Sequence, residues 1–421
     1  MSKQNALTLV TPVIPGRRDE LERKLLKIRA ELSAGTFKEF EKIDTLHYAR
    51  FVMLDGQLSN AATNLVYSSD YDGDLDEHLL SITTQCADLI DHIYDCCEGY
   101  PRPGSRTPQS RELYLRKWNN KDEAFYVGAP GRSVKQIKQE SALRDYIWDY
   151  LNKGKWDGKT ASQVHTEVRE YVMKNPEYTW AKQKISIPKL KWWNFMLVIS
   201  LALLLFPLTL FVAVVVVVWL LVLHFKYEVK DKPLGLKPSQ INQKLIEEME
   251  EYEDHQNQNQ FTQIVAMKPG WMRKITIKAV LLYGKFRIHN EFVDGELMGI
   301  PTIHFARWVM LDNNKQVLFF SNFDGSWQQY LGDFIDKSGW GLSGIFSNTA
   351  NFPRTRYLFW GGAYDEEHFL AWARYTQITT HVWYTAYPQL SIKNVTTNSI
   401  IRHELMRDLN EAQAQTFLNR F

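Results

Sequence analysis

The sequence predicts an α+β protein in which two ferredoxin-like β-α-β-β-α-β repeats form one α+β barrel within the chain, interrupted by a hydrophobic membrane segment. The first observation is internal repetition, because the eleven residues from Thr45 return from Thr302 with eight identical positions. Two shorter segments repeat in the same order: Ser69–Gly73 with Ser321–Gly325, and Pro15-Gly16 with Pro269-Gly270. The second observation is an apolar run, Trp192 to Phe225, between the two copies. Together they predict an internal duplication around a membrane segment.

Apolar periodicity predicts the elements of the first copy. Strands alternate apolar and polar residues, helices repeat apolar residues every three or four positions, and the Asp72-Gly73 pair marks a turn. The expected order is strand Ala6–Val13, helix Asp19–Leu32, strands His47–Leu54 and Asn64–Ser68, helix Leu75–Cys97, strand Glu123–Val127, and an added helix Val134–Leu151.

The second copy repeats this order. Its expected elements are strand Phe261–Met267, helix Met272–Tyr283, strands His304–Leu311 and Gln316–Ser321, helix Trp327–Lys337, strand Arg356–Trp360, and an added helix Glu366–Thr379. Two such copies are expected to pack their sheets about a pseudo-two-fold axis. The predicted boundaries are residues 1–151 and 261–421 for the repeats, 152–191 for a helical extension to the membrane, 192–225 for the membrane segment, and 226–260 for an amphipathic helix with a polar linker.

The pattern resembles the dimeric α+β barrel superfamily, which includes dye-decolourising peroxidases and chlorite dismutases, over most of both soluble parts. The Asp72-Gly73 and Asp324-Gly325 pairs are similar to the GxxDG motif of the peroxidases, although Ser69 and Ser321 replace its leading glycine. The resemblance implies a haem cofactor. It also implies that Asp324 and Arg307 would form a distal acid–base pair, with the iron ligand coming from one of three alternatives, His304, His368 or His381.

The same residues have a structural interpretation. His47 and Arg50 occupy in the first copy the places of His304 and Arg307 in the second. An asymmetric active site needs its constellation only once, so retention in both copies favours a structural role, in which His, Arg and Asp hold the same turn and an inter-strand salt bridge.

The apolar segment predicts insertion in a bilayer, because Asn194–Phe225 has no charged residue and only His224 is ionisable. Two topologies are open: one tilted span, or a re-entrant hairpin broken at Pro207. Lysines flank both ends of the segment, which places both ends in the cytoplasm by the positive-inside rule and favours the hairpin. The residues expected to contact the membrane are Trp192, Trp193, Pro207 and Trp219. Both soluble parts are then expected on the cytoplasmic side.

Composition excludes several functional classes. A net charge of +2, from 50 basic and 48 acidic residues, gives no support for nucleic acid as a partner. The start of the chain lacks the pattern of a cleaved signal peptide. Three cysteines, Cys86, Cys96 and Cys97, make a poor disulfide or metal framework and are expected to be small buried apolar residues in a reducing compartment. Phosphate-loop, zinc-protease and hydrolase motifs do not occur in the sequence.

Further features distinguish the copies. The glycine-rich Ser338–Phe346 and the aromatic His381–Tyr387 are candidates for an apolar ligand pocket, or else a mobile loop and a core strand. The basic loop Arg102–Lys117 is a candidate for lipid headgroup contact or for plain solvated surface. The leading hypothesis is a membrane-anchored, cytoplasmic-face binding or scaffold protein for lipid or an apolar small molecule. The alternative is a haem-dependent, peroxidase-like oxidoreductase.

Overall fold

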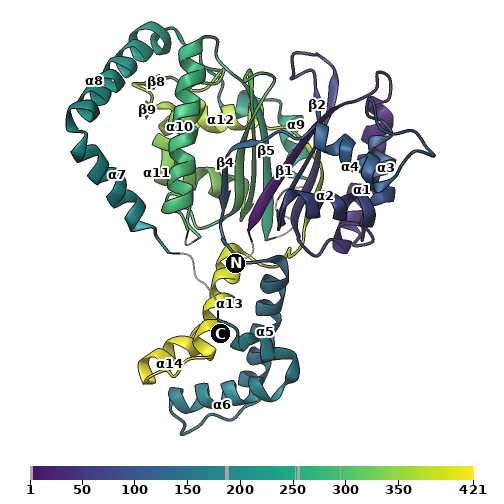
Figure 1. The fold of residues 1–421 in the computed structure, drawn as a ribbon, viewed down its shortest axis with the longest axis vertical. Coiled ribbons are helices and arrows are strands. Elements are labelled where there is room, and N and C mark those ends of the chain that lie inside the picture. Colours follow the sequence, from purple (N-terminus) through teal and green to yellow (C-terminus); the bar gives the residue numbers. More distant parts are fainter. Residues whose placement is uncertain (1–2, 185–188, 252, 254–256, 294) are drawn as a thin grey trace.

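The protein has a mixed α+β architecture with two antiparallel sheets that face each other (Figure 1). The computed structural model describes residues 3–184, 189–251, 253, 257–293 and 295–421. One sheet has the order β1-β3-β2-β10 and the other β4-β6-β7-β5. Their strands are β1 Gln4–Pro12, β2 Leu46–Asp55, β3 Thr63–Asp72, β4 Asp122–Val127, β5 Gln258–Ala266, β6 Ile303–Leu311, β7 Gln316–Asp324 and β10 Thr380–Thr385.

Helices cover the outer face of each sheet. The sheet that contains β1 is covered by α1 Arg18–Ser33, α2 Leu75–Gln85, α3 Ala87–Tyr94 and α4 Pro108–Lys117. The sheet that contains β4 is covered by α10 Trp271–Asn290, α11 Trp327–Phe346 and α12 Glu366–Thr376 (Figure 1). The positions of most elements agree with those expected from periodicity, although the single expected helix Leu75–Cys97 is divided into α2 and α3.

The two halves of the chain exchange their last strands. β4, from the first half, pairs with β6, and β10, from the second half, pairs with β2. The prediction that 123–127 completes the first sheet was therefore wrong. So was the prediction of a fourth strand at Arg356–Trp360, where the structure has only the short hairpin β8 Thr355–Arg356 and β9 Trp360–Gly361. A six-residue alternating strand specifies which of its faces is buried, but not which neighbour it pairs with.

The sheets meet through an apolar layer, but they do not close into the predicted barrel. The layer takes side chains from both sheets: Val10, Val52, Leu54, Val66, Ile264, Val309, Leu311, Leu318 and Phe320. In the described part of the chain, single bridges such as Leu9 with Asn119 and Gln263 with Gln377 occur where the sheet edges approach each other. Continuous strand pairing between the sheets, which a closed barrel requires, is not found there.

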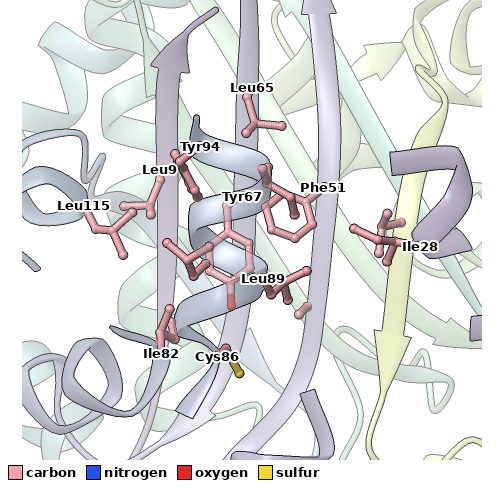
Figure 2. Packing of buried hydrophobic residues seen from close by; sticks show 14 of the residues in the cluster. Leu9, Ile28, Phe51, Leu65, Tyr67, Ile82, Cys86, Leu89, Tyr94 and Leu115 are labelled. Carbon is pink, nitrogen blue, oxygen red and sulfur yellow. The ribbon is translucent and has the colours of Figure 1, made fainter. Parts of the chain in front are cut away.

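The outer face of the first sheet packs on α2 and α3 (Figure 2). Phe51, Leu65 and Tyr67 project from the strands toward Ile82 and Leu89 of the helices, and all are buried. The three cysteines are buried in this core as free thiols, as the sequence predicts. Burial raises the pKa of Cys86 and of Cys97 to about 12, so both are protonated and chemically inert at neutral pH.

The apolar segment forms two helices, α7 Trp192–Leu204 and α8 Phe206–Val222, which we call the apolar arm. The break lies at Leu205, and Pro207 occupies the first turn of α8, close to the predicted bend. The Thr209 hydroxyl donates to the carbonyl oxygens of Ala202 (3.1 Å) and Phe206 (2.9 Å), so it supplies polar capping at the bend. Among the described residues, Phe206–Lys230 is one helical stretch long and apolar enough to cross a membrane.

Both ends of the apolar arm are fixed to α10 (Figure 1). At its start, Lys191 N donates to Asn290 O (3.0 Å) and the ring of Phe195 lies 5.5 Å from that of Phe286. At its end, Trp219 Nε1 donates to Thr276 Oγ1 (2.9 Å). The arm therefore arches over α10 and returns to the same globular body.

Polar contacts extend the second attachment. Beyond the arm, the fully buried Glu228 accepts hydrogen bonds from Thr355 Oγ1 (2.8 Å) and Leu358 N (2.9 Å). Asp231 then pairs with Lys268 and Arg273, each at 2.7 Å. A buried charge that lost such a partner would be destabilising, so this end of the arm is held firmly.

A separate bundle of helices carries the C-terminus (Figure 1). It consists of α5 Val134–Lys153, α6 Ala161–Lys174, α13 Ile392–Leu405 and α14 Glu411–Leu418, which share an apolar core. Within the predicted extension 152–191, α6 packs on the C-terminal helices before the chain reaches the arm, and residues 185–188 lie outside the described residues. In the predicted linker 226–260, α9 is Gln243–Glu250 and β5 already begins at Gln258; residues 252 and 254–256 of that prediction lie outside the described residues.

Acid should destabilise the fold through His78. This ring stacks on Tyr71 at 3.7 Å and shares a hydrogen bond with Ser69 Oγ (2.8 Å), and burial lowers its pKa to about 3. Between pH 6.5 and 3 the unfolded chain binds a proton that the folded chain does not. The free energy of unfolding therefore decreases as the pH is lowered, and at pH 4.5 it is about 3 kcal/mol smaller than at pH 7. In thermal melts at pH 7 and 4.5, His78→Gln should lose less stability on acidification than the wild type. An equal loss in both proteins would contradict this assignment.

Candidate functional site

The predicted His and Asp residues form two matching contacts, each between neighbouring strands of one sheet. His47 Nε2 lies 3.2 Å from Asp72 Oδ1, and His304 Nε2 lies 2.7 Å from Asp324 Oδ1. The second carboxylate oxygen of each aspartate accepts a backbone N–H from the first turn of a helix, Val134 N (2.8 Å) for Asp72 and Ile392 N (2.7 Å) for Asp324. A carboxylate is stabilised at a helix N-terminus. Each aspartate thus fastens the helix that follows an exchanged strand.

Arg50 and Arg307 cross from one sheet to the other. Arg50 Nη1 donates to Phe261 O (3.0 Å) and Thr262 Oγ1 (2.9 Å), and its Nη2 donates to Ser321 O (3.1 Å) and Asn322 Oδ1. Burial lowers the pKa of Arg50 to about 9.

In the opposite direction, Arg307 donates to Ser69 O (3.1 Å) and Ser68 Oγ of β3 and lies 3.7 Å from Asp70. The inter-strand contact of the structural interpretation is therefore made by the His–Asp pairs, whereas the arginines bond the opposite sheet. The arginines join two sheets.

The residues implied by the peroxidase resemblance do not form a haem site. His304 borders a cavity of about 10 Å³, which has room for about one water molecule. His381 is buried on β10, where its Nδ1 accepts from Met53 N (3.4 Å), and His368 pairs with Asp365 (2.8 Å) at the start of α12. The three histidines thus lie in separate surroundings, and Asp324 is occupied by His304 and a helix terminus. These residues do not fit a haem.

The best candidate for a ligand site is an apolar pocket between α10, α11 and the sheet strands β4 and β6. Its volume is about 70 Å³ and its wall is almost wholly apolar. The wall includes Tyr283 and Gly284 of α10, Trp308 of β6, Trp340 of α11, and Met298 in the turn before β6. Apolar pockets between helices are common binding sites for small molecules.

The glycine-rich segment helps to build this pocket, but it does so as a helix. The expected mobile loop was wrong, because 338–346 belongs to α11, which is kinked at Ser338 (φ −139°, ψ 22°). Its glycines allow close packing: a side chain at Gly341 would meet Met298, and one at Gly344 would meet Phe359. Glycine every few residues occurs both in loops and in tightly packed helices, so this sequence pattern does not distinguish between them.

The aromatic segment His381–Tyr387 belongs to a different site. Trp383 and Tyr384 of β10 line a cleft of about 470 Å³, together with polar groups that include Arg29 and Gln260. Arg29 is occupied by the carbonyl oxygens of Thr380 and His381. The segments 338–346 and 381–387, expected to form one apolar pocket, therefore line different cavities, and only 338–346 contributes to an apolar one.

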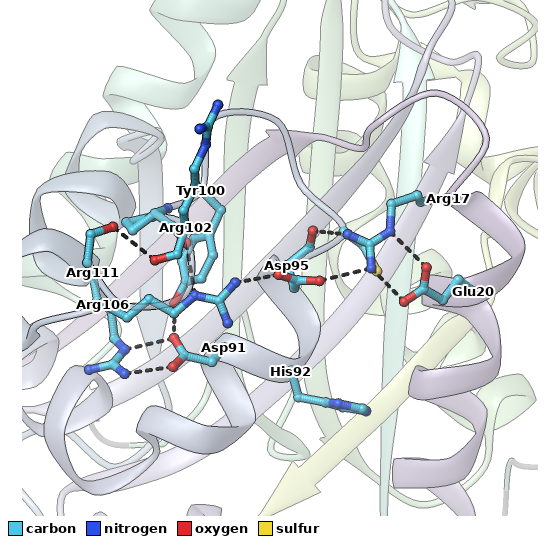
Figure 3. Close-up of polar contacts among 12 residues, drawn as sticks. Arg17, Glu20, Asp91, His92, Asp95, Tyr100, Arg102, Arg106 and Arg111 are labelled. Carbon is cyan, nitrogen blue, oxygen red and sulfur yellow. Dashed lines mark hydrogen bonds and ion pairs between the residues drawn. The ribbon is translucent and has the colours of Figure 1, made fainter.

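Three arginines of the basic loop pair with acidic residues, and two of these pairs are shown in Figure 3. Arg106 pairs with Asp95, Arg111 with Asp91 (2.7 Å), and Arg116 with Asp76 (2.7 Å). The loop and α4 also lie on the side of the molecule away from the apolar arm (Figure 1). Contact between this loop and headgroups beside the arm is therefore not supported.

Comparison with known protein families, with curated proteins and with solved structures finds no match to this chain.

Replacing either crossing arginine should destabilise the protein. Arg50→Ala removes four hydrogen bonds to the opposite sheet, and Arg307→Ala removes two together with the positive charge that faces Asp70, so each should lower the free energy of unfolding by about 3 to 5 kcal/mol. Chemical denaturation of both variants measures the effect, with Arg102→Ala, at an exposed arginine, as control. A change below about 1 kcal/mol in either variant would show that the sheets do not depend on these bonds.

Proposed function

We propose that the protein is a membrane-anchored, cytoplasmic-face binding protein for lipid or an apolar small molecule. The apolar arm is the observation that carries this proposal. Its side chains face outward, with exposed fractions as high as 85% at Trp193 and 79% at Leu204, and no Asp, Glu, Lys or Arg interrupts Trp192–Phe225. A continuous apolar surface of this size is stable in a bilayer and not in water.

The geometry of the arm favours entry into the bilayer from one side. At 1.5 Å per residue, α7 is about 20 Å long, α8 is about 20 Å long up to its attachment at Trp219, and the stretch of α10 between the two attachments is about 21 Å. A triangle with these sides has its apex about 17 Å from α10, which is less than the hydrocarbon thickness of about 30 Å. An arm held at both ends therefore enters the bilayer without crossing it.

The ends of the arm have the chemistry of a membrane interface. Trp192 and Trp193 are exposed at its start, and Trp271 and Trp360 are exposed near its end. Lysines adjoin both ends, at Lys191 and Lys226. Tryptophan and lysine are preferred at the headgroup level, so both ends are proposed to lie at the same, cytoplasmic surface. Trp219, in contrast, packs on Trp271 and is only partly exposed.

The relationship between the two halves is a further part of the proposal. The matching sequence segments, the paired His–Asp contacts and the paired crossing arginines support an origin by duplication of one ferredoxin-like unit. An open relative of the dimeric α+β barrel superfamily remains the proposed family relationship, and it rests on the fold pattern alone.

Membrane binding should depend on the arm. Phe211→Asp places a charge at an exposed site in α8 and should abolish flotation of the purified protein with phosphatidylcholine vesicles, because a carboxylate is unfavourable in hydrocarbon. Leu113→Asp is the matched control, since Leu113 is 71% exposed on α4, away from the arm. Loss of flotation in both variants, or in neither, would contradict a role of the arm as the anchor.

Both termini should be accessible from the cytoplasmic side. Epitope tags before Met1 and after Phe421, probed in cells before and after permeabilisation of the plasma membrane, should behave identically. A C-terminal tag that is glycosylated or exposed outside, while the N-terminal tag is inside, would show that the arm crosses the bilayer.

A further inference from the structure

We infer that the pocket between α10 and α11 binds the hydrocarbon chain of a bilayer lipid or fatty acid, which enters between the two attachments of the apolar arm. This inference rests on the proposed membrane attachment and names the ligand class for the pocket.

The pocket and the arm share one face of α10. Residues at spacings of three and four lie on one side of a helix, and Thr276, Val280, Tyr283, Arg287 and Asn290 follow this spacing. Thr276 bonds the end of the arm through Trp219. Asn290 bonds its start, through Lys191 N and through Asn194 Nδ2 (2.6 Å).

The three residues between these attachments line the pocket: Val280, Tyr283 and Arg287. Val280 also packs in the apolar cluster at the end of the arm. A lipid that lies within the arch is thus adjacent to the pocket, with apolar surface on both sides of its path.

The wall and size select an alkyl chain. About 70 Å³ holds roughly five groups the size of a water molecule, which corresponds to about five methylene groups. The Ser338 hydroxyl in the wall already donates to Phe334 O (3.3 Å), so it does not call for a polar ligand. A chain end fits this space, whereas a charged or strongly polar group would lose its hydration without a partner.

The polar end of the ligand belongs outside the pocket. Arg287, at the rim, is held by Glu291, and its guanidinium lies 4.8 Å from the ring centre of Phe292. This charged group borders the entrance and keeps it hydrated, so a single-chain amphiphile would keep its head there while its tail enters. Met298, whose unbranched side chain adapts its shape, allows chains of different length.

A photoreactive chain tests this site. The full-length protein is placed in phosphatidylcholine nanodiscs with either a fatty acid or a phosphatidylcholine that carries a diazirine at the end of the alkyl chain. After illumination, mass spectrometry should locate adducts on pocket residues such as Met298 and Trp340, besides adducts on α7 and α8. Adducts from the fatty acid alone would identify a free acid as the source, and adducts from the phospholipid would identify a bilayer lipid.

A pair of glycine variants supplies the control. A Cβ atom added at Gly284 or at Gly332 would meet nothing within 4 Å, but only Gly284 lines the pocket. Gly284→Leu should therefore reduce pocket adducts at least tenfold, while Gly332→Leu should leave them unchanged. Adducts confined to the arm, or pocket adducts that persist in Gly284→Leu, would overturn the inference. Vesicle flotation should be unchanged in both variants, so failure of membrane attachment would be distinguished from failure of the pocket.

Discussion

The two buried arginines are the constraint on which the arrangement of the sheets depends. A guanidinium that is removed from water must have hydrogen-bond acceptors, and Arg50 and Arg307 find theirs on the opposite sheet. Sliding one sheet over the other would separate charged donors from their acceptors. The apolar layer of valine, leucine and phenylalanine side chains supplies most of the favourable burial, but it is not directional. The arginines therefore determine the relative position of the sheets, and the aspartates extend that order to the helix that follows each exchanged strand.

Local pattern predicted most elements of the fold, because alternation and helical spacing are properties of neighbouring residues. The pairing of the strands was predicted less well. The strands at 123–127 and 380–385 carry ordinary alternation, and their exchange between the sheets depends on contacts with residues more than 170 positions away. A register shift in β6 between Ile303 and Phe305 is a second feature that the sequence did not predict. Strict alternation places His304 on the face opposite Arg307. In the structure, however, the His304 ring lies near Tyr48 of the other sheet. Irregularities of this kind leave no mark in hydrophobic periodicity.

The candidate site was predicted in part. The sequence drew attention to 338–346, which does line the apolar pocket, but it suggested a loop because glycine and serine are frequent there. The contribution of α10 was not anticipated. Its residues Val280, Tyr283 and Gly284 belong to an ordinary amphipathic pattern, and only the packing of α10 against α11 turns them into a pocket wall. The histidines attracted attention because of their chemistry, yet His304 and His381 are held by buried partners, and His368 pairs with the exposed Asp365.

The strand exchange also affects the order in which the chain can fold during synthesis. The edge of β2 has no partner until β10 has been made, and β10 follows the apolar arm by more than 150 residues. The ribosome therefore releases the hydrophobic arm while the first sheet is still incomplete and its edge unprotected. Capture of the arm by a membrane at that stage would keep the nascent chain at the surface while it waits for its last strand. Under the proposed membrane attachment, the bilayer would then act as a folding aid as well as an anchor.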